Sequence, residues 1–169
     1  MKPRVYLAVF LLIIPVQASL SNPISLSGIK PDFALAVLYI IGLLSGPVEG
    51  ALAGMAVGLV QDISSASLIG VGGFTRGLFG LSAGILGKRV LDIASPSNMV
   101  FLTAFALAEG LIITLFLQIF YGAVPFFSIF FTRMIPQALY TGILGTLLLH
   151  FLAGKKVAST LLRRSLQKE

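Results

Sequence analysis

Residues 99–121, MVFLTAFALAEGLIITLFLQIFY, form an apolar run with one charged side chain, Glu109. A helix of this length crosses the ~30 Å hydrocarbon core of a bilayer, because each residue adds about 1.5 Å. The same character extends outward along the chain: 57% of the 169 residues are hydrophobic and 11% are charged, and the mean hydropathy is +1.01. A soluble domain has roughly a quarter of its residues charged. The sequence therefore predicts a single all-α integral membrane domain.

Five further apolar runs predict a bundle of about six transmembrane helices: Val5–Leu20, Phe33–Leu44, Val48–Val60, Gly73–Gly87 and Phe126–Leu152. The first run also has the features of a signal peptide, with Val16-Gln17-Ala18 as a cleavage site, and its removal would leave five spans. The second and third runs are short and bounded by glycine or proline. Such segments are typical of helices that are tilted, buried among neighbours or re-entrant.

The distribution of basic residues predicts that both termini are cytoplasmic. With that orientation, only Lys30, Arg76 and Arg133 of the 12 basic residues lie at or near the outer face. The others lie inside, including those of the basic tail, residues 155–169. We therefore predict a multi-pass protein of the bacterial inner membrane with a transmembrane domain over residues 1–154. The net charge is +6, but the basic residues lie at the ends of apolar runs, which indicates membrane orientation rather than nucleic-acid binding. The basic tail could bind either the anionic inner lipid leaflet or an acidic cytoplasmic partner.

A glycine repeat marks the third run, in which Gly46, Gly50, Gly54 and Gly58 recur every four residues. Positions four apart share one helix face, and small residues there let two backbones approach closely in lipid. Two pairs in the fourth run, Gly73 with Gly77 and then Gly80 with Gly84, repeat the spacing. The pattern predicts close helix packing, either within the chain or against a helix of a partner protein.

Charged side chains inside apolar runs are costly and often functional. Glu109 lies midway along its run without a second acid or histidine, so a protonated or hydrogen-bonded packing residue is favoured over a proton relay. Asp62, Arg76 and Arg133 are expected together in the outer half. Our hypothesis is that Asp62 pairs with Arg76 or Arg133; the alternative is that these side chains reach the interface separately.

No residue pattern supports catalysis or a bound cofactor. The chain has no cysteine and one histidine, His150, which lacks a second ligand at metal spacing. The serines lack the histidine and aspartate company that nucleophilic catalysis needs, and the glycines form no phosphate-binding loop. We therefore expect a protein that is not an enzyme and holds neither metal nor cofactor.

The stretch from Pro31 to Val90 resembles the rod shape-determining protein family MreD. The resemblance begins with Pro31-Asp32 before a short apolar span, and continues through Gly46-Pro47 and the glycine repeat. Its most specific part is the succession of three features, which are the segment Gly58-Leu59-Val60-Gln61-Asp62, the turn Ser64-Ser65-Ala66-Ser67 and the segment Leu68-Ile69-Gly70. A glycine-rich span ending in Gly87-Lys88-Arg89 follows.

The resemblance implies a non-catalytic scaffold of the cell-elongation machinery that builds side-wall peptidoglycan. Its implied fold is similar to that of the S-components of energy-coupling factor transporters. Its implied partners are a bitopic MreC-type protein and, indirectly, the MreB-type cytoskeleton and a RodA-type polymerase with its class B transpeptidase. The implied contact region comprises Gly46, Pro47, Gly50, Gly54, Gly58, Asp62, Ser64 and Gly70.

An alternative function belongs to a different class, the substrate-binding S-component itself. Asp62, Arg76, Arg133 and the loop Ser21–Lys30 would then line an outer vitamin pocket. Against this interpretation, the run Val5–Leu20 lacks the small-x-x-x-small face with which such proteins dock on their transporter.

Overall fold

The computed structural model describes residues 24–64, 70–89, 95–122 and 125–166, and its regular structure there is helical. The helices are α2 (Phe33–Ser45), α3 (Pro47–Ser64), α4 (Val71–Arg89), α5 (Ser97–Tyr121), α6 (Phe126–Ile129), η1 (Phe130–Met134) and α7 (Ile135–Leu166). The predicted first span, Val5–Leu20, and its cleavage site lie outside the described residues. The all-helical fold expected from the sequence is confirmed for the part of the chain that the structure describes.

The short helix α2 forms the centre of the bundle. It packs against α3, α4, α5 and α7, and Leu35, Leu38 and Tyr39 are almost completely buried. These side chains join Ala83 of α4, with Leu102 and Leu149, in one apolar core. A helix that is apolar on every side belongs in the interior of a bundle. Of the three explanations considered for a short second span, the structure supports burial among neighbours.

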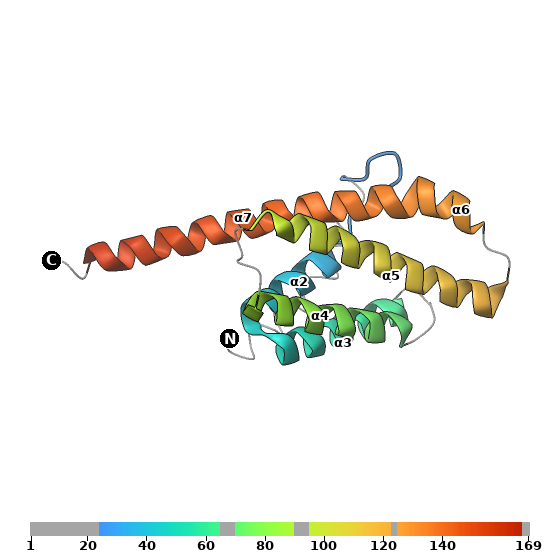
Figure 1. The fold of residues 1–169 in the computed structure, drawn as a ribbon, viewed down its shortest axis with the longest axis horizontal. Helices are drawn as coiled ribbons and strands as arrows, with labels where there is room; N and C mark the ends of the chain where they lie inside the picture. The colour runs from blue at the N-terminus through green and yellow to red at the C-terminus, as the bar shows by residue number, and fades with distance from the viewer. Residues whose placement is uncertain (1–23, 65–69, 90–94, 123–124, 167–169) are drawn as a thin grey trace.

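Helices α3 and α4 lie side by side (Figure 1) and form the most extensive helix contact in the described chain. A Cβ atom placed on Gly50, Gly54 or Gly58 of α3 would overlap a backbone carbonyl of α4. The overlapped carbonyls belong to Gly80, Arg76 and Gly72, respectively. The glycine face of α3 is therefore filled by α4 within the same chain.

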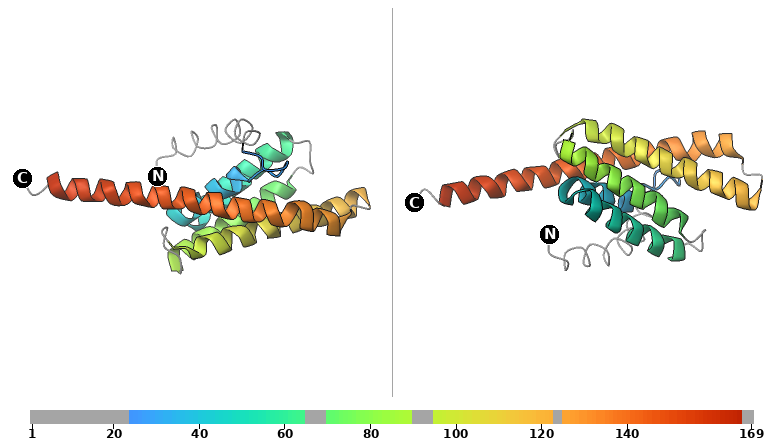
Figure 2. Two further views of the ribbon diagram at one scale, coloured as in Figure 1. Left: turned by 90° about the horizontal axis from the view of Figure 1, so that it is seen from above. Right: turned by 60° about the horizontal axis from the view of Figure 1, so that its bottom comes forward.

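Helices α5 and α7 form a second, longer pair, and α7 extends beyond the rest of the bundle towards the C-terminus (Figures 1 and 2). The predicted sixth run is divided here into α6, the π-helical turn η1 and α7. Pro136 follows this π turn. Proline lacks an N–H and its ring collides with the carbonyl four residues earlier, and a π turn is one way for a helix to absorb such a disruption.

Within the described residues, two helical segments are long and apolar enough to cross a membrane, namely Ser97–Tyr121 and Phe126–Leu152. Helix α2 is apolar but has only 13 residues. The described chain is thus a helical protein with candidate membrane spans, and the count of six spans and the cytoplasmic termini stay predictions. Helix α7 passes through Gly154 without a break and ends at Leu166, so the backbone of most of the basic tail is helical.

Candidate functional site

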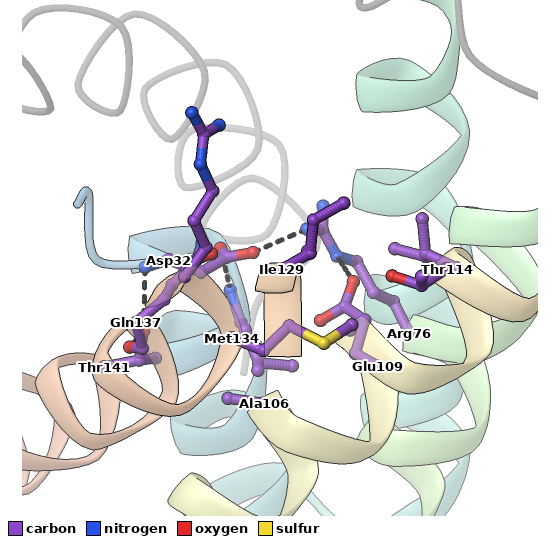
Figure 3. A pocket seen from close by; sticks show the side chains of 13 residues that line it. Asp32, Arg76, Ala106, Glu109, Thr114, Ile129, Met134, Gln137 and Thr141 are labelled. Atoms are coloured by element: carbon purple, nitrogen blue, oxygen red, sulfur yellow. Dashed lines mark hydrogen bonds and ion pairs between the residues drawn. The ribbon is translucent and has the colours of Figure 1, made fainter. Parts of the chain in front are cut away.

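Arg76 of α4 joins two carboxylates from different helices in the interior of the bundle. Its Nη2 lies 2.7 Å from Oδ2 of Asp32, and its Nε lies 2.7 Å from Oε1 of Glu109. The arginine and glutamate side chains are 9% and 6% exposed. The planar guanidinium offers several donors in fixed directions, which lets one arginine hold two acids at once. This cluster, which we call the Arg76 bridge, ties α4 to α5 and to the start of α2 (Figure 3).

Asp32 connects the Arg76 bridge to two further helices. Its Oδ1 accepts a hydrogen bond from the Leu35 N–H at 2.9 Å and so caps the N-terminus of α2. Its backbone N–H donates to Oγ1 of Thr141 in α7 at 2.9 Å. The hydroxyl of Thr141 donates its own proton to the Gln137 carbonyl, so its oxygen is the acceptor in the contact with Asp32. One residue before α2 therefore contacts α2, α4 and α7.

A cavity of about 260 Å³ adjoins the Arg76 bridge. Helices α2, α4, α5, α6 and α7 and the π turn η1 contribute its lining, which consists of Asp32, Leu35, Arg76, Ala106, Glu109, Gly110, Ile113, Thr114, Ile129, Arg133, Met134, Gln137 and Thr141. Figure 3 shows that the labelled lining side chains come from several helices. Arg133 and Gln137 are exposed, whereas Glu109 and Thr114 are buried. The cavity thus has a buried polar wall and an exposed polar rim.

Asp62 does not form the ion pair that we expected from the sequence. Its Oδ2 accepts hydrogen bonds from the backbone N–H groups of Gly70 at 2.9 Å and Gly73 at 3.2 Å. Arg76 pairs with Asp32 and Glu109 instead, and Arg133 forms no ion pair with any described residue. The predicted pairing of Asp62 with Arg76 or Arg133 is therefore wrong. A carboxylate at the end of α3 is used to hold the start of α4, where unpaired N–H groups favour negative charge.

The other predicted contact residues lie around the α3–α4 pair. Gly46, with a φ of +109°, ends α2, and Pro47 begins α3, which is the first helical position that proline favours. Ser64 ends α3 and donates to the Val60 carbonyl at 2.7 Å. Gly70, with a φ of +101°, precedes α4. Residues 65–69 of the serine turn lie outside the described residues.

Sequence reasoning missed the role of Asp32 and the partner of Glu109. The available signal was an aspartate directly before an apolar run, which is a helix N-cap pattern. Read in this way, the pattern would have placed Asp32 at the start of α2, but it gives no sign that Arg76 is its partner. The run that contains Glu109 has no second acid or histidine. The partner of Glu109 is a basic residue of another helix, Arg76 of α4.

Comparison with known families identifies the group to which this architecture belongs. A family model described as rod shape-determining protein MreD matches residues 2–154. The chain belongs to the MreD family. The resemblance that we drew from residues 31–90 is therefore confirmed and extends over the whole helical bundle. Comparison with curated proteins and with solved structures gave no match.

Membership of the MreD family associates the chain with the determination of rod shape and with the membrane. The matched range contains the Arg76 bridge, the cavity and the α3–α4 pair. In this MreD-family chain, the polar interior therefore belongs to the family domain and not to the tail that follows residue 154.

Proposed function

We propose that this protein is a non-catalytic scaffold of the cell-elongation complex, required for rod shape and for side-wall peptidoglycan synthesis. The observation that supports this function is the MreD family match over residues 2–154. The proposed location is the inner membrane, with six spans and both termini in the cytoplasm. A bundle whose helices are tied together by the Arg76 bridge suits a component that positions other proteins.

The proposed direct partner is a bitopic MreC-type protein, through which the MreB-type cytoskeleton, a RodA-type polymerase and a class B transpeptidase are reached. The family resemblance supports this list. We expected the glycine face of α3 to be a candidate contact, but α4 fills it. A partner helix therefore cannot occupy this glycine face while α4 is packed on it.

The outer face of α3 is the surface that we assign to the partner helix. Its apolar side chains recur at helical spacing and are exposed to between 39% and 67%: Val48, Leu52, Met55, Leu59 and Ile63. This stripe avoids the buried glycines of α3 and ends beside Asp62, although Met55 and Leu59 at its edge also adjoin Gly77 and Gly73 of α4. A single transmembrane helix packing along this stripe would form the van der Waals contacts that hold membrane helices together. The buried surface would adjoin the family-specific segment Gly58-Leu59-Val60-Gln61-Asp62.

Disulfide cross-linking tests this assignment, because the chain has no cysteine of its own. Single cysteines at Leu52 and Met55 would be paired with a cysteine series along the transmembrane helix of the MreC-type protein. We expect cross-links that recur every three or four residues on the partner helix. A matched control cysteine at Val100, which is 69% exposed on α5, should give none.

Affinity purification of the tagged chain in mild detergent tests the function itself. Recovery of an MreC-type protein with cell-wall synthases is the expected result. Cross-links from Val100 but not from Leu52 would reject the assigned face while leaving the scaffold function intact. Absence of an MreC-type protein from the purified complex would count against the function.

A second candidate function is the substrate-binding S-component. The observation that favours it is the cavity lined by Arg76 and Arg133, two of the three residues that this alternative placed in a pocket. Asp62 is not among the lining residues and binds backbone instead. Recovery of paired ATPases with a transmembrane coupling subunit in the same purification would favour this alternative.

A further inference from the structure

The cavity beside the Arg76 bridge contains buried polar groups whose hydrogen-bonding capacity the described residues do not use. Glu109 is 4% exposed, and its Oε1 binds Arg76. Its Oε2 accepts no hydrogen bond from the described chain, and it points away from Arg76 (Figure 3). The hydroxyl of Thr114, which is 6% exposed, likewise forms no hydrogen bond with those residues. Both residues line the cavity, and neither oxygen is among the fully enclosed atoms without a partner, so both are open to the cavity.

The charges around the cavity are unevenly distributed between its wall and its rim. Two carboxylates, Asp32 and Glu109, share the single guanidinium of Arg76 at the wall. With both acids ionised, this group, in which Arg76 and Glu109 are buried and Asp32 is partly buried, has an excess negative charge. Arg133 lies at the exposed rim of the same cavity and makes no ion pair with the described chain. Buried excess charge is unfavourable unless it is paired and hydrogen-bonded.

We propose that the cavity binds a small zwitterion, with its ammonium group at Glu109 Oε2 and its phosphate or carboxylate group at Arg133. An ammonium group supplies the donors that Glu109 Oε2 lacks and also offsets the excess charge of the wall. An anionic group a few bonds away pairs with the guanidinium of Arg133.

The size and position of the cavity fit a headgroup-sized ligand. Its volume of about 260 Å³ lies just below the range of roughly 300–1,000 Å³ for sites that hold drug-sized molecules. Arg133 and Gln137 at the rim are exposed, so the zwitterion has two possible sources, an amine-bearing phospholipid headgroup and a free molecule such as phosphoethanolamine. Both sources offer the same recognition chemistry.

Native mass spectrometry of the full chain in mild detergent tests the proposal. Phosphatidylethanolamine, phosphatidylglycerol and phosphoethanolamine would be added separately at equal concentrations. We expect the two amine-bearing compounds, or one of them, to be retained at least tenfold better than phosphatidylglycerol, which has the phosphate without the amine. Retention of phosphatidylethanolamine alone assigns the lipid as the source, and retention of phosphoethanolamine assigns the free headgroup.

Variants locate the ligand in this cavity. Gly110→Leu fills the space without removing a polar group, since a Cβ on Gly110 meets only Met134, at 3.4 Å. Thr114→Val removes one hydroxyl and leaves the Arg76 bridge intact. We expect Gly110→Leu and Glu109→Gln to reduce retention of the zwitterion at least tenfold, and Thr114→Val to reduce it severalfold.

The matched controls are Glu49→Gln on the exposed first turn of α3 and Thr132→Val, neither of which lines the cavity. Both should retain the ligand as the parent chain does. Equal retention of phosphatidylglycerol, no retention of any of the three compounds, or unchanged retention by Gly110→Leu would each overturn the proposal. The assay is carried out without partner proteins and is independent of the scaffold function.

Discussion

Arg76 and Glu109 lie 33 residues apart in the chain, and Arg76 Nε donates to Glu109 Oε1 across 2.7 Å. The same guanidinium reaches Asp32, 44 residues away, with a second nitrogen. Three helices are therefore held by one side chain inside a bundle whose other buried groups are mostly apolar. Substitutions of Arg76 and of Asp32 therefore test how much these contacts stabilise the bundle.

Substitution of Arg76 should be among the most destabilising changes in the domain. Arg76→Met leaves the buried carboxylate of Glu109 and the partly buried carboxylate of Asp32 without their partner, and the loss of one member of a buried ion pair costs about 3–5 kcal/mol. Arg76→Lys should be intermediate, because an ammonium group cannot reproduce the two fixed contacts of the guanidinium. The measurement is the unfolding midpoint in detergent, followed by helical circular dichroism. Arg133→Gln is the control and should leave the midpoint nearly unchanged.

The glycine face of α3 should tolerate no side chain. Gly54→Val places atoms where the Arg76 carbonyl lies. Because a backbone carbonyl cannot rotate away as a side chain can, α3 and α4 have to separate. Overpacking of this kind typically costs about 1–3 kcal/mol of folding free energy. We expect loss of folded protein in membranes, measured by its yield in detergent extracts. Gly154→Val is the matched control, since no atom lies within 4 Å of a Cβ at that position. Equal yields of the two variants would contradict the packing described for α3 and α4.

Asp32 performs two separable tasks, capping α2 and binding Arg76. Asp32→Asn retains a side-chain oxygen for the Leu35 N–H but removes the charge, whereas Asp32→Ala removes both contacts. The difference between the two variants should be close to the value of an N-cap, about 1 kcal/mol. Denaturant titration of both variants in the same detergent gives this difference. Identical midpoints would mean that the cap contributes nothing measurable.

Asp62 should behave as a backbone acceptor and not as the ion-pair partner of Arg76. Asp62→Ala leaves the N–H groups of Gly70 and Gly73 without this acceptor, at a cost of about 1–3 kcal/mol. A charge swap is diagnostic: Asp62→Arg should not be rescued by Arg76→Asp, because Arg76 pairs elsewhere. Rod shape in cells that express the double variant as their only copy is the readout. Recovery of rod shape would show that the two residues are paired after all.

Several features of the fold follow from sequence patterns that act over short distances. The apolar runs predict helices because the bilayer leaves backbone groups no other way to be satisfied. The spacing of Gly50, Gly54 and Gly58 predicts a face without side chains, since positions four apart lie on one side of a helix. The turn at Gly46-Pro47 likewise follows from local backbone preferences. Each of these inferences depends on residues that are neighbours in the chain.

The tertiary structure decided which of these surfaces meet. The glycine spacing gives no information about its neighbour, and only the fold shows that α4 fills this face. Charge alone suggested Asp62 as the partner of Arg76. The sequence does not show which of several acidic side chains at one depth of a bundle faces a given arginine. The selection of Asp32 and Glu109 depends on how α2, α4 and α5 are rotated about their axes, and that rotation is set by the packing of the apolar core around Leu35, Leu102 and Leu149. The sequence alone therefore determines the helices and their small-residue faces, whereas the pairing of buried charges depends on three-dimensional packing.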